Sequence, residues 1–144
     1  MAAHYKSRGM TLIGALDTLL ESYGHYWERT INLSFGGADG TEKMKNLMDG
    51  LRNTPPSHIG GLGIIRCRDY STGEITQLAN GAKEPTNLPL SNVLYFELEG
   101  DCAVIVRPSG TEPKVKVYLM GKSDSTALSN DILDKLEEDM KRLI

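Results

Sequence analysis

Three short segments near the C-terminal end alternate apolar and polar residues with a period of two. In residues 114–120 the odd-numbered positions are Val, Val and Leu, whereas the first three even-numbered positions are Lys, Lys and Tyr. Such alternation is typical of strands that bury one face of a sheet and leave the other face in water. Residues 93–99 and 102–107 are strand-like as well, and Gly-Asp between them indicates a hairpin. We therefore predict an antiparallel sheet that needs helices against its buried face.

Two segments with helical periodicity supply those helices. The first is predicted at residues 40–53, where Asp39 and Glu42 have the spacing of a capping box and Pro55 forbids continuation. The second closes the chain and carries acidic residues opposite its apolar stripe. The stripes are Met44, Leu47, Met48 and Leu51 in the first segment, and Leu128, Ile132, Leu133, Leu136, Met140 and Leu143 in the second.

The remaining β-rich segments complete an α+β fold. Residues 26–35 and 62–70 are predicted strands, which gives an antiparallel sheet of about four to five strands with two helices on one face. Residues 71–91 carry Gly, Pro and Asn with little periodicity, so we expect a long irregular excursion. A loop of that length is either a mobile surface segment or a functional one.

The N-terminal residues are predicted to form two helices, 1–8 and 12–23. Thr11 is a suitable N-cap for the second helix, and a glycine follows each helix. Leucines recur at spacings of three and four along the second helix and give it an apolar face that needs a partner. We expect residues 1–24 to be a helical remnant of a preceding domain, and 25–144 to form the C-terminal domain.

Composition excludes several classes of function. Sixteen Lys and Arg against nineteen Asp and Glu give a net charge of −3, which argues against a nucleic-acid partner. No apolar stretch approaches the length of a bilayer span, so no membrane partner is expected. Cys67 and Cys102 lie in apolar runs and are predicted to be buried reduced thiols, which favours the cytoplasm. His4, His25 and His58 lack ligand spacing, so no metal site is predicted.

The connection between the last two predicted strands has the chemistry of a phosphate clamp. It reads Arg-Pro-Ser-Gly-Thr-Glu-Pro-Lys from Arg107 to Lys114. Each proline biases the residue before it to extended backbone, while Gly110 is free to take a positive φ. Backbone N–H groups in such a turn form a concave nest for an anion, and Ser109 and Thr111 add hydroxyl donors. Arg107 offers a planar fork suited to phosphate, with Lys114 as a second positive charge.

Local charge supports this interpretation, although a purely structural role for the loop stays open. From Cys102 to Lys122 there are four basic residues and one acidic residue in a chain of net charge −3. The alternative is a rigid hairpin loop whose Ser and Thr satisfy their own backbone through local turns. The motif is not a nucleotide P-loop, because it lacks Lys-Ser or Lys-Thr after a second glycine and has no strand-to-helix context.

The segment from Arg107 to Leu119 resembles the C-terminal phosphate-binding loop of the α-D-phosphohexomutases, the phosphoglucomutase and phosphomannomutase family. Residues 88–94 and 39–52 also resemble that family, and residues 1–26 resemble the end of its third domain. The resemblance covers nearly the whole chain, and the loop motif is highly specific. It implies a four-domain parent, an isomerase that moves a phosphoryl group between the 1- and 6-hydroxyls of a hexose through a bisphosphorylated intermediate.

By this resemblance the chain is the fourth domain, whose fold is similar to the TATA-binding protein. Arg107, Ser109, Gly110 and Thr111 would hold the non-reacting phosphate of the substrate, with Lys114 as a further member and Glu112 without an assigned role. The resemblance implies no catalytic residue and no metal ligand in this sequence, because the family's phosphoserine, magnesium and sugar-recognition loops do not occur in it.

The implied partners are a hexose phosphate substrate and the upstream domains of the same chain. No cofactor is expected in this chain, whereas magnesium and a hexose bisphosphate activator are expected for the parent. The chain alone is expected to lack mutase activity. The competing hypothesis is a non-enzymatic anion-binding or regulatory interaction module that reuses this fold, since fold alone does not decide function.

Overall fold

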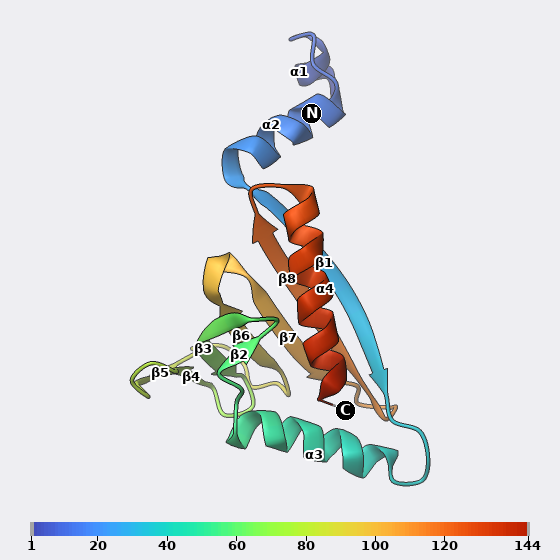
Figure 1. The fold of residues 1–144 in the computed structure, drawn as a ribbon, viewed down its shortest axis with the longest axis vertical. Helices are drawn as coiled ribbons and strands as arrows, with labels where there is room; N and C mark the ends of the chain where they lie inside the picture. Colours follow the sequence, from blue (N-terminus) through green and yellow to red (C-terminus); the bar gives the residue numbers. More distant parts are fainter. Residues whose placement is uncertain (1, 144) are drawn as a thin grey trace.

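The computed structural model describes residues 2–143 and consists of one antiparallel sheet with helices (Figure 1). No helix within the described residues is long and apolar enough to span a membrane. The elements are α1 (Ala2–Lys6), α2 (Leu12–Tyr23), β1 (His25–Ser34), α3 (Gly40–Asn53), β2 (His58–Ile59), β3 (Leu62–Asp69), β4 (Glu74–Gln77), β5 (Lys83–Pro85), β6 (Leu94–Leu98), a 3₁₀ turn (Glu99–Asp101), β7 (Ala103–Pro108), β8 (Lys114–Ser123) and α4 (Thr126–Arg142).

The sheet has eight strands, with β2 pairing only with β3 and the others in the order β1-β8-β7-β6-β3-β4-β5. The predicted count of four to five was too low, because β2, β4 and β5 were not foreseen. The stretch 71–91, predicted as irregular, contains β4 and β5, which extend the sheet beyond β3. β4 has four residues and is partly buried, and β5 has three residues that are all exposed, so both are too short to display a period of two. Their backbone pairing, and not a pattern of side chains, makes them strands.

The core lies between one face of the sheet and the helices α3 and α4, as the alternation predicts. Val115, Val117 and Leu119 are fully buried on β8, and Phe96 is fully buried on β6. In Figure 1, α4 lies along β1 and β8, while α3 lies at the end of the sheet where β7 joins β8. Among the described residues, no helix covers the opposite face of the sheet. The α+β class with two covering helices is therefore confirmed.

Of the two N-terminal helix caps that the sequence predicts, one forms and one does not. Thr11 caps α2, because its hydroxyl accepts a hydrogen bond from the N–H of Gly14 at 3.0 Å. The capping box predicted for α3 does not form, although the helix has the predicted bounds. The side chain of Asp39 makes no cap hydrogen bond and instead pairs with Lys43 at 2.9 Å. The backbone of Asp39 is not extended (φ −94°, ψ 5°), so its carboxylate does not face the first turn.

The N-terminal helices project beyond the end of the sheet opposite to α3 (Figure 1). The helix predicted at residues 1–8 is shorter in the structure, spanning Ala2–Lys6, and Met1 lies outside the described residues. The apolar face of α2 has no cover: Leu12, Leu16 and Leu19 are each about half exposed, and only Ala15 is buried.

Both cysteines are free and buried, as predicted. Burial raises the pKa of the Cys67 thiol to about 11, so the neutral thiol is its form in the folded protein.

Candidate functional site

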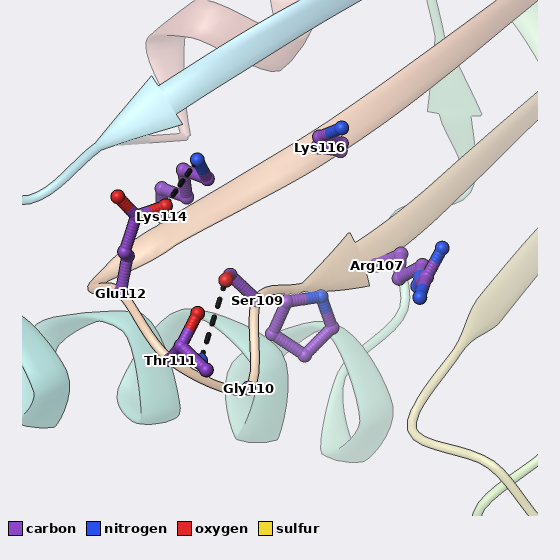
Figure 2. Close-up of a pocket in the computed structure, with 8 residues that line it drawn as sticks. Arg107, Ser109, Gly110, Thr111, Glu112, Lys114 and Lys116 are labelled. Atoms are coloured by element: carbon purple, nitrogen blue, oxygen red, sulfur yellow. Dashed lines mark hydrogen bonds and ion pairs between the residues drawn. The ribbon is translucent and has the colours of Figure 1, made fainter.

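The candidate site is the hairpin that joins β7 to β8. Their register places Arg107 directly opposite Lys116 and Pro108 opposite Val115. Because opposite residues point to the same face of a sheet, and Val115 belongs to the core, Arg107 and Lys116 extend from the face without helices. A pocket of about 380 Å³ opens at this hairpin (Figure 2). It is lined by Arg107, Pro108, Ser109, Gly110, Thr111, Glu112, Lys114 and Lys116.

Backbone hydrogen bonds close the loop between the two strands. The N–H of Ser109 donates to the carbonyl of Lys114 at 2.8 Å, and the N–H of Lys114 donates to the carbonyl of Glu112 at 2.7 Å. The N–H of Thr111 donates to the hydroxyl oxygen of Ser109 at 3.4 Å. This is a local serine turn of the kind that a purely structural role of the loop requires. The hydroxyl hydrogens of Ser109 and Thr111 remain available as donors, because these contacts use neither of them.

The linker between β1 and α3 packs against the loop and holds it in place. The N–H of Phe35 donates to the carbonyl of Pro113 at 2.8 Å. Gly40, the first residue of α3, packs so closely that a Cβ there would lie 2.3 Å from the carbonyl oxygen of Phe35 and 3.1 Å from Cβ of Pro113. Only glycine fits at this position without displacing the linker. The pocket is therefore fixed to the core through Phe35 and Gly40.

Gly110 is free to take a positive φ but does not adopt one in the structure. A Cβ at Gly110 would meet nothing within 4 Å. The backbone of Gly110 therefore borders open space.

The charges of the site are unevenly compensated. Lys114 forms an ion pair with Glu112, and this hydrogen-bonded lysine holds the pKa of the Glu112 carboxyl below its ordinary value (Figure 2). Within residues 2–143, neither Arg107 nor Lys116 pairs with a carboxylate. Like charges directly opposite each other on adjacent strands destabilise a sheet. Arg107 and Lys116 are therefore a pair of cations without an ion-pair contact among the described residues, and an anion would neutralise them.

The structure brings together all five residues that the sequence predicts for the site, namely Arg107, Ser109, Gly110, Thr111 and Lys114. Sequence reasoning missed Lys116. Only part of the signal was present in the sequence, where Lys116 shares a face with Lys114 in the alternation. Its position opposite Arg107 comes from the strand register, with residues 108–115 between the two. Within residues 2–143 no group of three His, Cys, Asp or Glu side chains is placed to hold a metal ion.

The chain matches a known protein family over part of its length. Residues 71–138 match the family described as "Phosphoglucomutase/phosphomannomutase, C-terminal domain". The match includes β4 to β8, the hairpin and most of α4.

Individual relatives agree with this match. The chain is 33% identical over 110 residues to the phosphoglucomutase of Staphylococcus saprophyticus, which covers 76% of this chain and 20% of that protein. It is 36% identical over 120 residues to the phosphoglucomutase of Staphylococcus epidermidis (82% and 21%). It is 35% identical over 128 residues to that of Staphylococcus haemolyticus (88% and 23%). The chain thus spans about a fifth of the length of these relatives.

A solved structure shares the fold. This is the open form of the exocytosis-sensitive phosphoprotein pp63/parafusin, a phosphoglucomutase from Paramecium. The two structures align with a TM-score of 0.54 at 11% identity, over 98% of this chain and 24% of the other.

Proposed function

Because the chain contains a C-terminal domain of the phosphoglucomutase/phosphomannomutase family, we propose that its β7–β8 pocket binds the phosphate group of a hexose phosphate. The observation that carries this proposal is the opposition of Arg107 and Lys116, two exposed cations without a carboxylate partner within residues 2–143. A phosphate dianion between them turns an unfavourable pair into two charge-assisted contacts.

Each lining residue has a distinct task in this proposal. The guanidinium of Arg107 binds two phosphate oxygens with its planar fork, and Lys116 adds a mobile point charge. The hydroxyls of Ser109 and Thr111 donate to the remaining oxygens, and Gly110 lets the phosphate approach the backbone. No lining residue is a phosphoryl donor, so the pocket orients the phosphate that does not react while chemistry occurs at the other end of the sugar.

The activity of a longer protein follows from the family. We propose that the parent is an isomerase that interconverts hexose 1-phosphate and hexose 6-phosphate, with magnesium and a hexose bisphosphate activator supplied at upstream domains. We place it in the cytoplasm. The chain alone is expected to show no mutase activity, because the pocket supplies positioning without a phosphoryl donor or a metal.

The uncovered face of α2 fits the same proposal. We propose that residues 1–24 are the end of the preceding, third domain, and that the half-exposed leucines of α2 contact that domain in the parent. In the isolated chain, amide hydrogen exchange is expected to be fastest before Tyr23. Strong protection of α2 in a chain shown to be monomeric would contradict this assignment.

A titration with glucose 1-phosphate, followed by amide NMR, tests the site. The amides of Ser109, Gly110 and Thr111 are expected to shift first, with a dissociation constant of about 1 mM, which corresponds to about −4 kcal/mol. Glucose without phosphate is the matched control and should leave them unmoved. Arg107→Lys should weaken binding about tenfold or more, since lysine keeps the charge but loses the fork. Shifts confined to residues 71–91 would place the phosphate elsewhere and refute the proposal.

A further inference from the structure

Glu112 is the one carboxylate among the residues that line an otherwise cationic pocket. Its Oε2 contacts Nζ of Lys114, while the side chain of Glu112 is 59% exposed and that of Lys114 is 33% exposed. A carboxylate at this position repels a phosphate and occupies one of the pocket's cations. A site built only for tight anion binding would not include it, so its presence needs a functional explanation.

The backbone holds the two side chains together. The hydrogen bond from the N–H of Lys114 to the carbonyl of Glu112 joins residues two apart and forms a γ-turn centred on Pro113. The fixed φ of proline suits the common form of this turn. The carbonyl of Pro113 accepts in turn from Phe35, so the turn is anchored to the core. The braced backbone therefore keeps these two exposed side chains close to each other.

We propose that Glu112 competes with the bound phosphate for Lys114 and thereby weakens the hold of the pocket on its ligand. The proposal rests on the proposed function, because it assigns a regulatory role within the same phosphate site. In the empty pocket Lys114 is neutralised by Glu112, whereas Arg107 and Lys116 are free to attract the phosphate. When phosphate binds, Lys114 exchanges its carboxylate partner for a phosphate oxygen.

Exposure makes such an exchange feasible. An ion pair in solvent is weak, and its partners separate without leaving a buried charge unpaired. The three donors of a lysine ammonium turn readily from one acceptor to another. A weakened hold acts mainly on the dissociation rate, which is where affinity is usually adjusted. Glu112 would therefore shorten the time that a sugar phosphate stays in the pocket and favour its release.

A double-mutant cycle tests the competition. The chain and its variants Glu112→Gln, Lys114→Met and the double variant are titrated with inorganic phosphate at fixed ionic strength, and the amides of Ser109 to Thr111 report the dissociation constants. Glu112→Gln is expected to tighten binding about two- to fivefold, the range of an exposed ion pair. In the Lys114→Met background the same substitution should have a clearly smaller effect, because no lysine remains to compete for.

Controls separate the possible failures. Glu138→Gln removes an exposed carboxylate on α4, which packs against the opposite face of the sheet, and should leave the dissociation constant unchanged. In every variant, the amide chemical shifts outside the hairpin should match those of the unaltered chain, which would show that the fold is kept. Weaker or unchanged binding in Glu112→Gln, or an equal effect in both backgrounds, would overturn the competition. If phosphate does not shift the loop amides of the unaltered chain, the proposed function itself fails.

Discussion

Replacing Lys116 with methionine is expected to stabilise the fold and, at the same time, to weaken phosphate binding. Lys116 lies directly opposite Arg107, and opposite Cβ atoms are about 5 Å apart, so we work the repulsion for two charges about 6 Å apart. In water their repulsion is about 0.7 kcal/mol, and screening at physiological salt reduces it to about 0.3 kcal/mol. Methionine keeps an unbranched apolar stem and removes that repulsion.

The effect on the ligand has the opposite sign and is larger. A phosphate dianion about 4 Å from the ammonium of Lys116 gains about 2 kcal/mol in water, or about 1.2 kcal/mol after screening. Losing that contact should weaken binding about fivefold to tenfold. Opposite signs for stability and affinity are the mark of a residue kept for its ligand and not for its fold.

Two measurements check this expectation. Urea unfolding gives the change in stability, and a phosphate titration gives the change in the dissociation constant. Lys135→Met is the matched control, because Lys135 is exposed on α4 and no carboxylate pairs with it within residues 2–143. It should alter neither value appreciably. A Lys116→Met chain that is less stable and binds phosphate as tightly as before would refute the reasoning.

Further expectations concern residues outside the pocket. Gly40→Ala should destabilise the chain by about 1–3 kcal/mol, because the added Cβ clashes with the preceding linker. Gly50→Ala should stabilise the chain by about 0.5–1 kcal/mol in urea unfolding, because a Cβ there meets open space on α3. The pKa of Glu137 is lowered by hydrogen bonds from lysine and arginine, so its contribution to the stability of the fold exists above pH 4.5 and is lost as the pH falls. The difference in unfolding free energy between the chain and Glu137→Gln should therefore shrink below that pH. Cys67 and Cys102 should resist iodoacetamide near neutral pH until the chain unfolds, and rapid alkylation would contradict their burial.

The parts of the fold that the sequence predicts well are those where several local signals agree. Helix α3 has the predicted bounds, because its apolar stripe ends where two prolines forbid continuation. Strands β6 to β8 follow from alternation imposed by a face that is fully buried. The strands β4 and β5 were missed because strands of three or four residues depend on backbone pairing, which leaves little trace in side-chain type. The cap at Asp39 failed because the backbone there is not extended, and the carboxylate pairs instead with a lysine four residues later.

The composition of the pocket was largely predictable, whereas its charge balance was not. A single continuous motif supplies Arg107, Ser109 and Gly110, so their proximity requires only that a hairpin forms. Lys116 enters through the strand register, which depends on the length of the loop. The pairing of Lys114 with Glu112 depends on a turn at the intervening proline, which no periodicity reveals.

A crystal structure of this chain with glucose 1-phosphate tests the central claim most directly. The account predicts that the phosphate lies in the β7–β8 pocket, within hydrogen-bonding distance of Arg107 and Lys116 and of the hydroxyls of Ser109 and Thr111. Phosphate bound at another surface of the molecule, with the β7–β8 pocket empty, would contradict it.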